Sequence, residues 1–137
     1  MIKGGPDVLE KMSRFRADQT GSVTVETVIW LPVFFMAALL VADVSYLFTV
    51  NASMWEAARV GAREAALHRS DAEGAERAAE KVLISPTKPY DITGRVGDRY
   101  VEVIVSLPAS EAGLTGFITS AISGDLRASV EMGREPG

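Results

Sequence analysis

The stretch that decides the fold is "SVTVETVIWLPVFFMAALLVADVSYLFTV", which runs from Ser22 to Val50. Between Val28 and Ala42 it carries no charged residue, and after Asp43 its apolar character resumes. A bilayer core needs about 20 helical residues, so this stretch is long enough to cross one. A helix buried in a globular core is the alternative. It is less favoured, because little else in the chain is apolar enough to surround such a helix.

The basic residues near this stretch predict its orientation. Four of them precede it, namely Lys3, Lys11, Arg14 and Arg16. No Lys or Arg follows until Arg59. Because basic residues near a membrane span stay in the cytoplasm, we expect a single-pass protein with a cytoplasmic N-terminus. Everything after about Val50 then lies outside the cytoplasmic membrane.

The remaining chain predicts a small α+β domain after a long helix. The apolar helix should continue to about Leu67, and a second helix capped by Ser70 or Asp71 should run to Leu83. "YDITGRVGDRYVEVIVSLP" has the alternation of a β-hairpin. The residues of helical spacing after Pro108 predict another short helix: Leu114, Phe117, Ile118, Ala121 and Ile122. The alternating "LRASVEM" should add a third strand that pairs with the hairpin.

Small residues recur at helical spacing on the second half of the long helix. They are Ala58, Gly61, Ala62 and Ala65. Such a stripe allows another element to approach closely, either the domain's own sheet or a second protein. A plain Ala-rich surface is the other interpretation. Gly61 favours a packing role, because glycine in a helix interior costs about 1 kcal/mol relative to alanine.

The composition argues against an enzyme, a cofactor or a metal site. The 137 residues include one His and no Cys, and the net charge of -4 gives no nucleic-acid-binding surface. His68 lies near the predicted helix end and is expected to be exposed rather than catalytic. The acids Asp71, Glu73, Glu76 and Glu80 are expected on a solvated helix face.

The unusual chemistry lies at the start of the apolar stretch. Glu26 places a carboxylate at the edge of hydrocarbon, where an ionisable group is presumed functional and needs a partner. A cut after Gly21 would create an α-amino group on Ser22, about one helical turn away, and a neighbouring helix could supply the same amine. Asp43 is expected near the outer bilayer boundary, where an acid needs no partner. Asp43→Asn should therefore be mild.

Two motifs then carry a family resemblance. "RFRADQTGS" followed by "VTVETVIWLP" resembles a class III prepilin signal of the type IV pilin superfamily. "AARVGAREAA", from Ala57 to Ala66, resembles the corresponding segment of the TadE-like minor pilins, or pseudopilins, of tight-adherence (Tad, Flp) pili. The ending "LRASVEMGRE" is similar to the closing strand of that family.

The resemblance implies three regions. Residues 1–21 would be a cytoplasmic leader, residues 22–50 a transmembrane and assembly helix, and residues 51–137 a periplasmic α+β domain. It implies cleavage by a prepilin peptidase between Gly21 and Ser22, with Glu26 as the assembly carboxylate. Pro32 would locally loosen the helix, because it frees the Val28 carbonyl from its usual donor.

The resemblance also implies the partners and the role. The partners would be the prepilin peptidase, the major Flp-type pilin, other minor pilins, the Tad inner-membrane platform with its motor, and membrane lipid. The protein would help to initiate or assemble a pilus for surface adhesion, and it would lie in the inner membrane or enter the filament. The alternative is an uncleaved, membrane-anchored periplasmic adaptor or accessory protein, in which Glu26 is an acid at the membrane interface.

Overall fold

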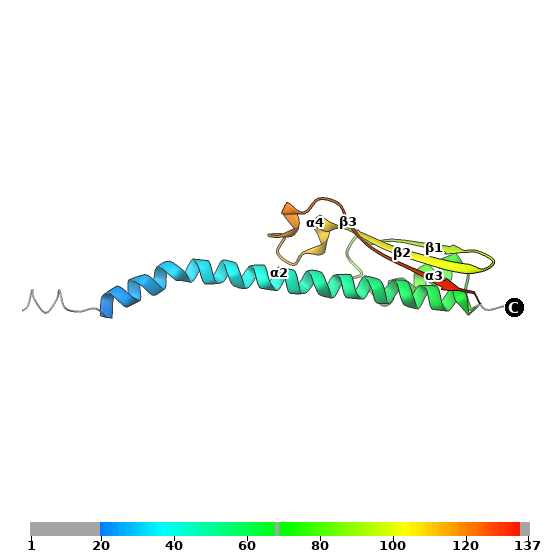
Figure 1. Ribbon diagram of the computed structural model, residues 1–137, viewed down its shortest axis with the longest axis horizontal. Coiled ribbons are helices and arrows are strands. Elements are labelled where there is room, and N and C mark those ends of the chain that lie inside the picture. The colour runs from blue at the N-terminus through cyan, green and yellow to red at the C-terminus, as the bar shows by residue number, and fades with distance from the viewer. Residues whose placement is uncertain (1–19, 68, 135–137) are drawn as a thin grey trace, which may run out of the picture. The chain divides into compact units, whose positions relative to one another are not determined.

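The structure is a computed structural model that describes residues 20–67 and 69–134 (Figure 1). The chain divides into two compact units, with the boundary between Ala38 and Leu39. The helix α2 (Thr20–Ala66) begins in the first unit and ends in the second. Most of the predicted leader, residues 1–19, lies outside the described residues, as does His68.

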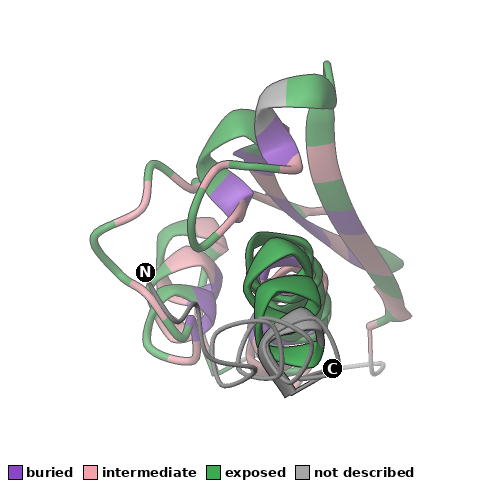
Figure 2. Ribbon diagram, turned by 90° about the vertical axis from the view of Figure 1, so that its left-hand side faces the viewer, coloured by how far each residue is buried: buried purple, intermediate pink, exposed green. Residues whose placement is uncertain are grey.

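The first unit is an exposed apolar helix. Every described side chain from Val23 to Ala38 is exposed, and Figure 2 shows this part of the helix end-on, as the green turns at the centre. Among the described helices, α2 is the one that is long and apolar enough to cross a membrane. This exposure differs from that of a helix inside a globular core, which would be mostly buried. The first unit therefore fits the membrane interpretation of the sequence.

The second unit contains a three-stranded antiparallel sheet. Its strands are β1 (Asp91–Val96), β2 (Tyr100–Pro108) and β3 (Asp125–Gly133), in the order β1-β2-β3. The hairpin register places Ile92 opposite Val105, and β3 pairs along the whole of β2. The predicted hairpin and third strand are confirmed, and so is the α+β fold class with a long N-terminal helix.

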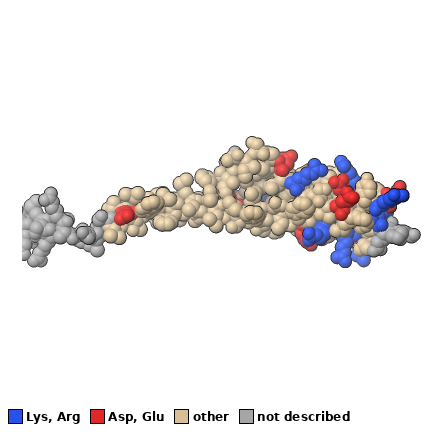
Figure 3. Space-filling model, in the orientation of Figure 1, with Lys and Arg blue, Asp and Glu red and all other residues tan. Residues whose placement is uncertain are grey.

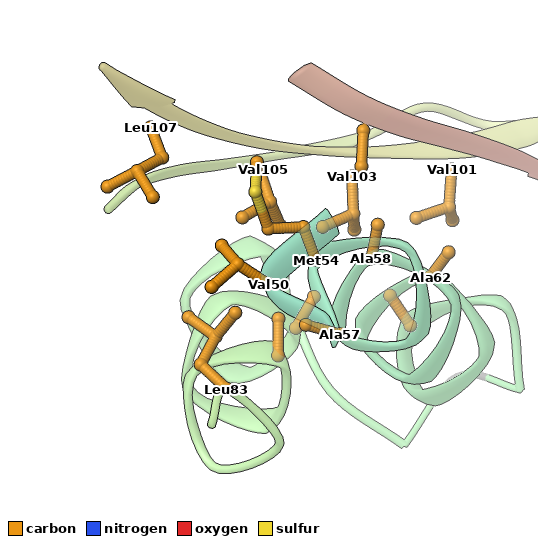
Figure 4. Close-up of a cluster of buried hydrophobic side chains, with 14 of the residues drawn as sticks. Val50, Met54, Ala57, Ala58, Ala62, Leu83, Val101, Val103, Val105 and Leu107 are labelled. Atoms are coloured by element: carbon orange, nitrogen blue, oxygen red, sulfur yellow. The ribbon is translucent and has the colours of Figure 1, made fainter. Parts of the chain in front are cut away.

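The core lies between the sheet and the second half of α2 (Figure 4). Alternate residues of β2 point toward the helix and are fully buried, namely Val101, Val103, Val105 and Leu107. They meet Val50, Met54, Ala57, Ala58 and Ala62 of α2. Alternate strand residues share a face, so these four side chains of β2 all point toward α2. They make up most of the sheet's buried contribution to this core. The branched side chains of β2 fill the space that the alanines of α2 leave.

The helix α3 (Ala72–Glu80) covers the β1 side of this core. Asp71 is its N-cap, because its Oδ1 accepts a hydrogen bond from the Gly74 amide at 2.9 Å. Ala75 and Ala79 are buried, as an amphipathic helix requires. The helix ends at Glu80 rather than at the predicted Leu83, although Leu83 is still buried in the core.

The prediction of a helix over residues 114–122 is wrong. The structure instead has a single turn, α4 (Ala109–Ala112), an irregular segment, and a short 3-10 turn, η1 (Thr119–Ala121). Gly116 adopts a positive φ of 78°, which interrupts a right-handed helix. Several amides of this segment bind a side chain of α2 instead of helical carbonyls, as detailed below.

Candidate functional site on the long helix

Glu26 is the charged residue of the described part of the first unit, where Figure 3 shows one acidic spot on an otherwise uncharged surface. Its side chain lines a shallow hollow of about 400 Å³ on the helix surface. Val23, Thr27, Trp30 and Phe34 complete this hollow. No cation among the described residues pairs with Glu26. A carboxylate in such apolar surroundings is costly in lipid unless a partner amine arrives.

Two other predicted site residues lie just ahead of Glu26. Gly21 and Ser22 belong to the first turn of α2. Four residues of α-helix rise about 6 Å and return to nearly the same face, so an amine on Ser22 would lie on the side of Glu26. Pro32 lies inside α2, where it removes one amide donor from the helix ladder.

The stripe of small residues lies inside the second unit. Ala58, Gly61, Ala62 and Ala65 are all buried. A Cβ added at Gly61 would lie 2.7 Å from the carbonyl oxygen of Ala75 and 3.2 Å from the Cβ of Ala79. Separations below 3.0 Å from backbone force a shift. Glycine at this position therefore lets α3 approach α2 closely.

Asp43 forms a site that the sequence did not reveal. Its side chain is 1% exposed, and its two oxygens together accept four hydrogen bonds. Oδ1 accepts from the amides of Leu114 at 3.1 Å and Thr115 at 2.7 Å. Oδ2 accepts from the Thr115 hydroxyl at 2.8 Å and the Ile118 amide at 3.2 Å. The expectation that Asp43 needs no partner is wrong.

The position of Asp43 explains why it has these partners. It follows directly on the uncharged run of α2, and the loop after α4 reaches back to it from more than seventy residues later. The only local sign is an acid within an apolar helix, which predicts a partner but not which one. Asp43 thus fixes the segment 113–118 against the first turns of α2 in the second unit.

The acidic residues of the described part of the chain do not gather into a metal site. No group of three or more His, Cys, Asp or Glu residues in this part of the chain could hold a metal ion. The acids of α3 lie apart: Glu73 pairs with Arg77, while Glu76 accepts a hydrogen bond from the Gly94 amide at 2.8 Å. The first interaction lies within α3, and the second joins α3 to β1.

Residues 21–63 match the family model of TadE-like proteins. The matched segment begins at Gly21 and includes Glu26, Pro32 and Gly61. The match covers less than half of the chain and supports a TadE-like protein of the Tad pilus system, as the motifs indicate. Neither a curated protein nor a solved structure gives a match to the chain.

Proposed function

We propose that this TadE-like protein is a minor pilin, or pseudopilin, of a Tad pilus. It would be cleaved after Gly21 and take part in the initiation or assembly of the filament. The family match over the processing and assembly residues carries the proposal. The partners would be the prepilin peptidase, the major Flp-type pilin, other minor pilins, and the inner-membrane platform with its motor.

The exposed half of α2 supports membrane anchorage before assembly. Its apolar side chains need either lipid or the apolar helices of other pilins around them. Asp43 is the first buried residue in the described part of α2, so the stretch exposed on all sides lies ahead of it, while Phe48 beyond it is still 68% exposed. The same apolar surface would contact lipid before assembly and the helices of other pilins after it. This suits a subunit that leaves the bilayer for a helical bundle.

Glu26 supports the assembly step. A carboxylate and an amine attract strongly where the dielectric constant is low, and cleavage after Gly21 would supply that amine on Ser22. The pair could form within one chain or between neighbouring helices. Either arrangement would neutralise a charge that is otherwise unpaired among the described residues.

Intact mass tests the cleavage. In cells with an active prepilin peptidase, the membrane-extracted protein should begin at Ser22 and lack the mass of residues 1–21. Gly21→Val should leave the full chain, because a branched side chain would then precede the bond, whereas the control Gly5→Val should be processed normally. A full-length wild-type protein in such cells would favour the uncleaved adaptor instead.

Glu26→Gln separates processing from assembly. The variant should be cut like the wild type, because the bond lies outside the hydrocarbon, but it should enter pili poorly, because a neutral amide cannot pair with the new amine. Pilus counts by electron microscopy and the mature mass measure the two steps. Glu26→Asp, which keeps the charge, should retain more assembly. Normal piliation with Gln at this position would exclude the amine pairing.

A further inference from the structure

The segment 113–124, "GLTGFITSAISG", contains no charged residue, although 23% of the chain is charged. It also exposes large apolar side chains to solvent. Leu114 is 60% exposed, Phe117 is 53% exposed and Ile122 is 43% exposed. Three large exposed apolar side chains in one short uncharged loop make it a candidate contact surface.

Several backbone amides of this segment have acceptors among the described residues. Asp43 accepts the amides of Leu114, Thr115 and Ile118, and the Thr115 hydroxyl oxygen accepts the Phe117 amide at 3.4 Å. The amides of residues 121 and 122 bind carbonyls of residues 118 and 119. Irregular backbone enters an apolar medium only when its polar groups are satisfied internally. These hydrogen bonds lower the cost of moving this part of the backbone out of water.

The place of the loop points to one apolar medium. Asp43 ties it to the residue that immediately follows the uncharged run, and within the second unit the preceding turn of α2 exposes Leu39, Leu40 and Val41. The loop and this turn form a largely apolar end of the second unit, at whose edge the Lys88 ammonium donates to the Gly113 carbonyl at 3.4 Å. Figure 3 shows most Lys and Arg residues toward the right-hand end of the molecule, away from this loop. Glu111 and Asp125 flank the uncharged segment and limit how deeply it can sink.

We infer that segment 113–124 docks into the outer interface of the bilayer that α2 spans, with Leu114, Phe117 and Ile122 among the lipid headgroups and upper chains. The inference rests on the membrane anchorage in the proposed function. Docking would hold the folded domain against the membrane before assembly. Moving the subunit from the bilayer into a filament would then require the loop to leave the lipid interface as well as the helix to leave the bilayer core.

Lipid quenching in single-tryptophan proteins tests the docking. The full chain is placed in phosphatidylcholine nanodiscs whose lipids carry bromine either near the headgroups or near the chain ends. The reporter is Phe117→Trp in a Trp30→Phe, Trp55→Phe background, and Ile122→Trp in the same background is a second reporter on the other limb of the loop. Both should lose more fluorescence to shallow bromine than to deep bromine.

Two natural tryptophans supply matched controls. Trp55 alone, 43% exposed and about 18 Å beyond Asp43 along α2, should not be quenched. Trp30 alone should be quenched by deep bromine if the helix is inserted. An unquenched Trp30 would overturn the anchorage and the docking together, whereas a quenched Trp30 with unquenched reporters at 117 and 122 would overturn the docking alone. A third outcome is that the reporters are not quenched and that their emission shifts to the blue only when several copies share a nanodisc. This outcome would assign segment 113–124 to a contact with a second copy and would also overturn the docking.

Discussion

Replacing Gly61 by leucine is expected to lower the free energy of unfolding of the second unit by about 3 kcal/mol, the upper end of the cost of overpacking. The first atom of any side chain at this position would lie 2.7 Å from the Ala75 carbonyl oxygen. That oxygen belongs to the backbone of α3, which cannot rotate away as a flexible side chain can. The Val103 Cγ1, at 3.4 Å, closes the sheet side of the same site.

Gly61→Ala makes the sharper test, because two effects predict opposite signs. Helix propensity alone would stabilise α2 by about 1 kcal/mol, since alanine is the better helix former. The contact with Ala75 predicts a loss, because even one methyl group must displace α3. We expect the contact to dominate and Gly61→Ala to be destabilising.

Denaturant unfolding of the full chain in detergent micelles measures both variants. Trp55 in a Trp30→Phe background reports the second unit alone, because Trp55 is its tryptophan. Ala52→Leu, at an exposed position of the same helix, is the matched control and should change stability little. If Gly61→Ala raised the stability, the close approach of α2 and α3 would be refuted.

The elements that could be predicted from sequence are those whose signals are local. The alternation of Val101 to Leu107 fixed the buried face of β2, and Asp71 is followed by a helix whose first turn it caps. The long helix follows from an apolar run without proline after Pro32. In each case the residues that determine the helix or strand lie inside it or next to it in the sequence.

The segment after Pro108 could not be predicted in the same way, because its structure depends on a distant partner. Apolar residues at 114, 117, 118 and 122 have helical spacing, yet they lie on an irregular loop that leaves several of them exposed. A helix would bind its amides to its own carbonyls, whereas here Asp43 accepts three of them. Periodicity detects a common face but not a competing acceptor elsewhere in the chain.

Asp43→Asn is accordingly expected to be severe, costing about 2 to 3 kcal/mol in the stability of the second unit. The substitution removes the negative charge that strengthens all four hydrogen bonds. It also replaces one carboxylate oxygen by an amide nitrogen, which cannot accept a hydrogen bond. If that oxygen is Oδ2, the Thr115 hydroxyl and the Ile118 amide lose their acceptor. At least one donor is then left buried without an acceptor.

Hydrogen exchange locates this loss. In the full-length Asp43→Asn variant, the amides of Leu114, Thr115 and Ile118 should exchange much faster than in the wild type, whereas the paired amides of β2 should change only as far as global stability falls. Asp98→Asn, at the exposed hairpin turn, is the matched control and should leave both sets unchanged.

Thr115→Val isolates one of the four bonds. It removes the hydroxyl that donates to Oδ2 and keeps the amide that donates to Oδ1, so its cost should be smaller, about 1.5 kcal/mol. If Asp43→Asn were as mild as Asp98→Asn, the carboxylate would not hold the loop. The segment 113–118 would then need another reason to abandon the helix that its apolar spacing favours.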